Sequence, residues 1–172
     1  MMSIFEPLHN FMLGPLVVKL RKEIEDYRVF NQPDLAANAY HLIMKFIGTM
    51  PDWHVRCQPR FGTKNPDIAI FQSYKVKAIA QFIFALKPDV PTFLPTQEIE
   101  EEIGWLNDVV AQRAPGGTGR GYIVTAYDYD KKWFVPQTQE KQHIFILPVN
   151  CHDVALHHLW RPKWDEQKKK LL

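Results

Sequence analysis

The chain has 172 residues, of which 46% are apolar and 13% are aromatic, and its formal net charge is +2. This length suits a single domain, and this apolar content is enough to fill a hydrophobic core, which argues against an intrinsically disordered protein. The small net charge does not by itself indicate a nucleic-acid binder, although one face of a protein can be basic while the rest is acidic.

Cysteine content and hydropathy indicate the compartment. Cys57 and Cys151 are the only cysteines, too few for a disulfide framework, and we expect both to be reduced thiols in an intracellular protein of the cytoplasm or nucleus. No apolar run approaches the roughly 20 residues that span a bilayer, and the N-terminus lacks the pattern of a secretory signal peptide. The sequence predicts one soluble domain over 1–172 with no membrane partner and a charged tail at 161–172.

Apolar periodicity predicts the elements in chain order. Helical spacing is found over 15–28 and 34–47, and three short strands are predicted at 53–58, 67–71 and 78–86. A helix that is acidic in its first turns begins at Thr96 and ends before Pro115. Further elements are predicted as strands at 122–127, 133–136 and 143–147 and as a short helix at 154–160. The order predicts an α/β domain, in which a mixed β-sheet is flanked by helices.

Two short segments suggest a chemical site. Pro66-Asp67 opens the second predicted strand, and Ala85-Leu86-Lys87 closes the third. If these two strands pair as a hairpin, Asp67 and positions 85–87 lie at the same end of it. Residues two apart on a strand point to the same face, so positions 85 and 87 lie side by side there. A carboxylate and an ammonium group are therefore expected to meet at one edge of the sheet.

On these residues, and on the element order around them, the stretch 33–127 resembles the PD-(D/E)xK nuclease-like superfamily. The resemblance implies a restriction-endonuclease-like core (α-β-β-β-α-β), here with extra C-terminal strands, and a metal-dependent nuclease that hydrolyses phosphodiester bonds in DNA or RNA. It also implies that Asp67 binds Mg²⁺ (or Mn²⁺), that Leu86 offers its backbone carbonyl to the metal, and that Lys87 holds the attacking water.

The chain departs from the family pattern at Ala85, which stands where the second acid of the motif is expected. An alanine side chain binds no metal, so a site with Asp67 as its one sure carboxylate is expected to bind Mg²⁺ weakly and to cut slowly or not at all. Two explanations stay open: Ala85 replaces an acid in an inactive form of a nuclease, or the chain is a natural pseudo-nuclease that binds nucleic acid or scaffolds a protein complex. A third reading is an interaction protein unrelated to nucleases, in which Asp67 and Lys87 lie far apart.

Basic residues near these segments are candidates for contacts with phosphates. They are Arg60, Lys64, Arg113 and Arg120. Members of the family often form dimers, which makes a homodimer or a larger complex a possible state, but no residue pattern identifies an interface.

Overall fold

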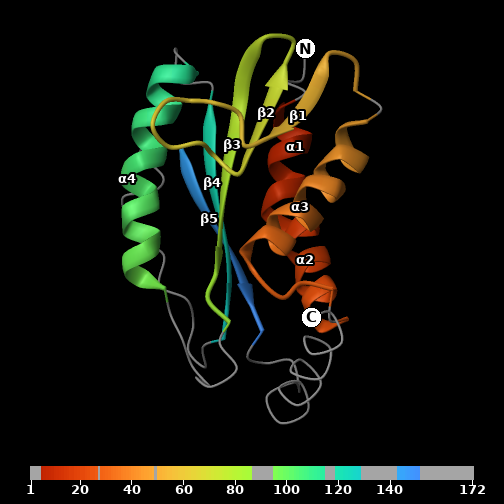
Figure 1. The fold of residues 1–172 in the computed structure, drawn as a ribbon. Coiled ribbons are helices and arrows are strands. Elements are labelled where there is room, and N and C mark those ends of the chain that lie inside the picture. The colour runs from red at the N-terminus through yellow and green to blue at the C-terminus, as the bar shows by residue number, and fades with distance from the viewer. Residues whose placement is uncertain are drawn as a thin grey trace.

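The computed structural model describes residues 5–26, 28–48, 50–86, 95–114, 119–128 and 143–151. A single five-stranded sheet forms its centre, and the strands follow one another in chain order (Figure 1). The strands are β1 (Trp53–Cys57), β2 (Ile68–Gln72), β3 (Lys75–Phe84), β4 (Arg120–Tyr127) and β5 (Ile144–Asn150). In these residues, no helix is both long enough and apolar enough to cross a membrane.

The sheet is mixed, as the order of the elements predicts. β1, β2 and β3 pair as consecutive antiparallel strands, whereas β4 and β5 run parallel to β3. A parallel connection needs a crossover, and α4 (Thr96–Arg113) supplies it between β3 and β4. The α/β class with a helix-flanked mixed sheet is therefore confirmed.

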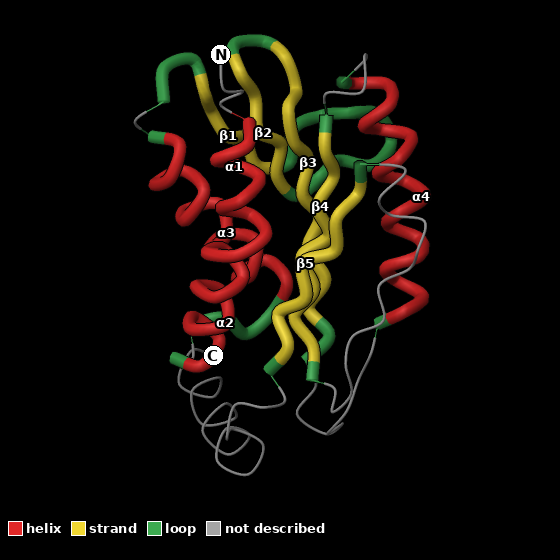
Figure 2. Tube along the Cα trace, turned by 180° about the vertical axis from the view of Figure 1, so that it is seen from behind, coloured by secondary structure: helices red, strands yellow, loops and turns green. Residues whose placement is uncertain are grey.

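Three helices precede the sheet and lie on the face opposite to α4 (Figure 2). α1 (Phe5–Phe11) continues through a π-helical segment (Met12–Leu16) into α2 (Val17–Glu25), and α3 (Gln32–Ile47) follows. The Asn31 side chain accepts the N–H of Asp34, whose carboxylate in turn accepts the N–H of Phe30. This reciprocal cap satisfies backbone donors at the start of α3.

Each face of the sheet has its own hydrophobic core. Residues on β2 to β4 alternate between the two cores, as the period of a strand requires: Ile68 and Ile70 pack with α1, α2 and α3, whereas Ala69 and Phe71 pack on the side of α4. A layer of helices thus covers each face. Odd and even positions lie on opposite faces along each regular stretch of strand. The irregularity opposite Ile70/Phe71 shifts this pattern within β3, so that Val76 lies in the α4-side core and Ala78 in the other core.

Most predicted elements are found within two or three residues of their predicted ends. The first helix is the main exception: the sequence predicts it from Pro15, but the helical segment begins at Phe5 and passes through Pro15 in the π-helical segment. A proline inside a helix disturbs the regular hydrogen-bonding pattern. The sequence alone therefore favours Pro15 as the first residue of the helix. The predicted strand at 133–136 and helix at 154–160 lie outside the described residues.

The close approach of α4 to the start of β4 gives a stability prediction. A Cβ atom added at Gly119 would lie 2.2 Å from the Cβ of Ala114 at the end of α4, so we expect Gly119→Ala to lower the free energy of unfolding by about 1–3 kcal/mol. Gly104→Ala in α4 is the matched control, because its added methyl meets nothing within 4 Å and alanine favours the helix. Urea denaturation of both variants checks this, and equal stabilities would contradict it.

Candidate functional site

Asp67 lies directly before β2 and faces the middle of β3. Ile68 pairs with Ala80 in the antiparallel register, which sets Asp67 opposite Gln81. The backbone N–H of Asp67 donates to Oε1 of Gln81 over 2.6 Å, and the N–H of Phe82 donates to Oδ2 of Asp67 over 2.9 Å. The carboxylate thus accepts a backbone N–H of β3 just before Ile68, the first paired residue of β2.

Gln81 links Asp67 to α4 and to the segment between β1 and β2. Its Nε2 donates to Oε2 of Glu102 over 3.2 Å. The other carboxylate oxygen of Glu102 contacts Nζ of Lys64, which also stands 4.7 Å from the ring centre of Trp105. In Figure 1 the segment that carries Lys64 crosses in front of the sheet towards α4. Lys64, Asp67, Gln81 and Glu102 form what we call the Asp67 cluster.

Burial dominates the electrostatics of Asp67. Removal from water raises the pKa of its carboxyl above the usual value, the Phe82 N–H opposes this shift, and the nearby Glu102 charge raises the pKa further. The Lys64 charge lowers the pKa of Asp67, but its effect is the smallest of these four. The carboxylates of Asp67 and Glu102 therefore repel one another at a partly buried position. A divalent cation bound between them would reduce this repulsion.

The Asp67 cluster offers few ligands for a metal ion. In the described part of the chain, no group of three or more His, Cys, Asp or Glu side chains comes together as ligands. Mg²⁺ commonly binds one or two carboxylates and completes its shell with water and phosphate oxygens, so Asp67 and Glu102 could serve it. However, Glu102 already contacts Lys64, and Gln81 contributes no charge. Affinity for a cation is therefore expected to be low.

The structure does not place Ala85 beside Asp67. Ala85 lies four residues beyond Gln81, or about 13 Å along an extended strand, and it is buried in the α4-side core. Its N–H bonds to the carbonyl of Ala126, which extends the pairing with β4. The assumed strand register was thus four residues too far along, and the idea of an acid replaced at Ala85 loses its geometric support.

Leu86 and Lys87 are the other two residues of that segment. Leu86 is buried in the core on the side of α1, α2 and α3, and therefore lies on the opposite face from the Asp67 cluster. Lys87 falls outside the described residues. Of the three members of the predicted centre that the structure describes, Asp67 is the one that faces polar partners.

The basic candidates divide between the two faces. Arg60, Lys64 and Arg113 are exposed, and Lys64 and Arg113 lie on the α4 side, the face of Asp67. Arg120 lies on the other face: its Nη2 bonds to Glu6 of α1 over 3.0 Å and its guanidinium stands over Phe145. Its prediction as a partner of the same site therefore has no support from the geometry.

Near Arg120, a buried tyrosine and a histidine form a second polar contact. Tyr122 is fully buried, and its hydroxyl lies 2.8 Å from Nδ1 of His9. Burial raises the pKa of Tyr122 and lowers that of His9, so both groups are neutral near pH 7. This pair satisfies polar atoms inside a core, which is a structural role.

Sequence reasoning missed Gln81 and Glu102. A signal for Gln81 was present, because it is the one polar residue in the apolar run from Ala78 to Phe84, and a polar residue inside a buried strand is informative. Glu102 had no such signal, since it is one of several acids in the first turns of α4. Only the packing of α4 against β3 distinguishes it.

Comparison of the chain with family models, with curated proteins and with solved structures finds no match. The geometry of the Asp67 cluster is therefore the main indication of what the chain does.

Proposed function

We propose that this chain is a nuclease-like domain of the PD-(D/E)xK type that binds nucleic acid at the Asp67 face, holds a divalent cation there weakly, and cleaves slowly or not at all. Three features support the type: a helix before three antiparallel strands, a crossover helix, and a parallel fourth strand. An aspartate that follows a proline at the start of β2 and faces β3 agrees with the resemblance.

The residue opposite Asp67 carries this proposal. When the family triplet is placed in the observed register, it falls on Gln81-Phe82-Ile83 rather than on Ala85-Leu86-Lys87. Gln81 then replaces the second acid, and Ile83, which is buried in the α4-side core, replaces the lysine. Because positions 81 and 83 of β3 supply neither a second carboxylate nor an ammonium group, the groups that activate water in such a centre are missing from these two positions.

A second candidate, an active metal-dependent nuclease, is favoured by one observation. Glu102 and Lys64 bring a carboxylate and an ammonium group to Gln81 from α4 and from the segment before β2. In this candidate, Glu102 serves as the second metal ligand and Lys64 stabilises the developing charge. It requires the Lys64–Glu102 contact to open when the cation binds.

Binding and cleavage assays on the wild-type chain separate the two candidates. We expect fluorescence anisotropy to detect binding of labelled DNA and RNA oligonucleotides, with an affinity that falls as salt is added. We expect gel analysis with Mg²⁺ or Mn²⁺ to show no cleavage above that of an Asp67→Asn control.

Each alternative result has a definite reading. Metal-dependent cleavage that disappears in both Asp67→Asn and Glu102→Gln supports the active nuclease and overturns the weak-cleavage proposal. Absence of binding to every oligonucleotide rejects both candidates and leaves an interaction protein with a nuclease-like topology.

A further inference from the structure

Aromatic rings and guanidinium groups gather on the α4-side face of β1 and β2. The Phe71 ring is buried at their centre, and the His54 ring lies flat on it with centroids 5.0 Å apart and planes 2° apart. Phe61 meets Phe71 edge-on at 6.4 Å. The Arg56 guanidinium carbon lies 5.4 Å from the centre of Phe71, and that of Arg113 lies 5.2 Å from the centre of Phe61. We call these five residues the arginine–aromatic patch.

The patch presents its functional groups to solvent. Arg56 and Arg113 are exposed, and His54 and Phe61 are half-buried. Two guanidinium groups and two planar rings are therefore accessible, while Phe71 holds them in place from below. Contact with the rings restricts the arginine side chains before any partner binds, which reduces the entropy lost on binding.

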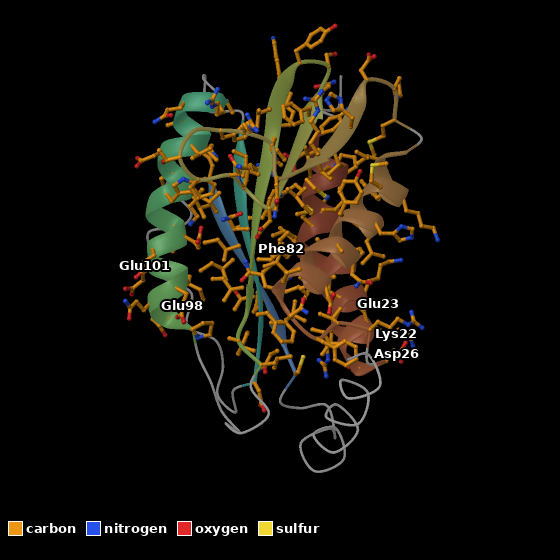
Figure 3. The ribbon with its side chains drawn as sticks, viewed as in Figure 1. Lys22, Glu23, Asp26, Phe82, Glu98 and Glu101 are labelled. Carbon is orange, nitrogen blue, oxygen red and sulfur yellow. The ribbon has the colours of Figure 1, made fainter. Side chains whose placement is uncertain are left out.

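The arginines of the patch have no acidic partner in the part of the chain that the structure describes. Arg21, Arg28, Lys64 and Arg120 all form ion pairs there, whereas Arg56 and Arg113 form none. Arg60, on the segment that carries Phe61, also forms none. The acids at the start of α4 are remote: Glu98 and Glu101 lie at one end of the helix (Figure 3), and fifteen residues, or about 22 Å, separate Glu98 from Arg113.

The patch also lies on the same face as Asp67. The side chains of residues 67, 69 and 71 lie on one face of β2. Arg56 of β1 pairs with Ala69, which lies between Asp67 and Phe71 on that face. Phe71 is thus about 13 Å from Asp67 along the strand. A chain of phosphates that contacts the arginines can continue to the Asp67 cluster.

We infer that the arginine–aromatic patch binds unpaired nucleotides of single-stranded nucleic acid, with Phe61 and His54 stacking on bases and Arg56 and Arg113 contacting phosphates. This inference rests on the proposed function and names its substrate class. Stacking requires the face of a base, which a duplex hides between its neighbours, whereas contacts with phosphates alone would not distinguish the two forms. The rings therefore select single strands, and the arginines supply the sequence-independent attraction.

Anisotropy titrations with labelled 15-nucleotide oligothymidine, 15-nucleotide oligouridine and a 15-base-pair DNA duplex test this inference. We expect both single strands to bind more tightly than the duplex at equal salt. Phe61→Leu retains an apolar side chain against Phe71 but removes the ring. It should weaken single-strand binding by about fivefold or more while leaving duplex binding nearly unchanged. Arg56→Gln and Arg113→Gln should each weaken binding and reduce the salt dependence by about 0.7 of a logarithmic unit per unit of log salt.

Lys45→Gln is the matched control, because Lys45 is an exposed cation of α3 on the opposite side of the sheet. We expect its binding curves to follow those of the wild type, and thermal melts should show that all four variants fold. Equal affinity for duplex and single strand, or patch variants that bind like Lys45→Gln, would overturn the inference while leaving nucleic-acid binding intact. If the wild type binds none of the three oligonucleotides, the proposed function fails together with the inference. The two single strands distinguish DNA from RNA as the source.

Discussion

Gln81→Glu is expected to destabilise the metal-free protein at neutral pH and to make its stability depend on divalent cations. Oε1 of Gln81 accepts the N–H of Asp67 and can be replaced by a carboxylate oxygen, but Nε2, which donates to Glu102, is lost. Three carboxylates then surround one partly buried place with Lys64 as the nearby cation. Repulsion between them costs stability, whereas a divalent cation that they hold together restores it.

Thermal melts with and without Mg²⁺, Mn²⁺ or Ca²⁺ measure this effect. Binding at a hundred times the dissociation constant adds about 2.7 kcal/mol, or a rise in Tm of roughly 5–10 °C for a domain of this size. Gln97→Glu is the control, since Nε2 of Gln97 also donates to a glutamate, Oε1 of Glu101 over 3.0 Å. The substitution loses the same kind of bond, but on the exposed surface of the first turn of α4, where water screens the two carboxylates. If divalent cations do not change the Tm of the Gln81→Glu protein, the assignment of Gln81 to the position of the missing acid is contradicted.

The same substitution allows a test of lost catalysis. We expect Gln81→Glu combined with Ile83→Lys to cleave labelled oligonucleotides in Mn²⁺, where the wild type does not, because the pair restores a second metal ligand and an ammonium group on one face of β3. Ile83 is 9% exposed, so burial of the lysine stem is tolerable only if its ammonium group reaches solvent or the cation. Melts of the double variant therefore accompany the cleavage assay.

Asp67→Asn is expected to raise the Tm at neutral pH by about 2–4 °C, which corresponds to about 1 kcal/mol in a domain of this size. The same substitution should weaken the binding of divalent cations. Burial raises the pKa of Asp67 in the folded protein above its usual 3.8. The folded state therefore holds this proton more tightly than the unfolded chain. Ionisation of Asp67 costs stability progressively as the pH rises from 3.8 through the higher pKa of the folded state, and the full cost is present at neutral pH.

Asparagine removes that charge and retains an oxygen that can accept the Phe82 N–H. The gain in Tm should therefore disappear below pH 3.8, where Asp67 is protonated in both states. Asp67→Ala provides the control, because it loses the acceptor and should leave the Phe82 N–H without a partner, with a lower Tm. An Asp67→Asn protein less stable than the wild type at pH 7 would show that the carboxylate stabilises the fold, as in an ordinary structural ion pair.

Sequence patterns determined the elements and the class of fold. The apolar stripe of residues 34–47 and the apolar run of 78–86 report helical and strand periodicity directly, because the side that faces a core must be apolar whatever packs on it. The start of the first helix was predicted wrongly because Pro15 is as compatible with a helix start as with a π-helical segment inside a longer helix.

The site was only partly within reach of the sequence. Pro66-Asp67 was found from the motif alone, and the alternation of β3 could have put Gln81, Ile83 and Ala85 on one face. Which of these lies opposite Asp67 depends on the strand register, which the hairpin at Ser73-Tyr74 and an irregularity at Ile70/Phe71 fix. A shift of four residues preserves every face and changes only the distance along the strand.

By itself, the sequence determined a mixed α/β fold and marked Asp67 as a candidate site residue at one edge of the sheet, since local periodicity and a short motif carry that information. The tertiary structure decided what Asp67 meets: Gln81 from the hairpin register, Glu102 from the rotation of α4, and Lys64 from the path of the preceding segment. It also brought Phe61 and Arg113 together across 52 residues of chain. Such contacts depend on how elements pack, and packing angle and register leave no local trace in the order of amino acids.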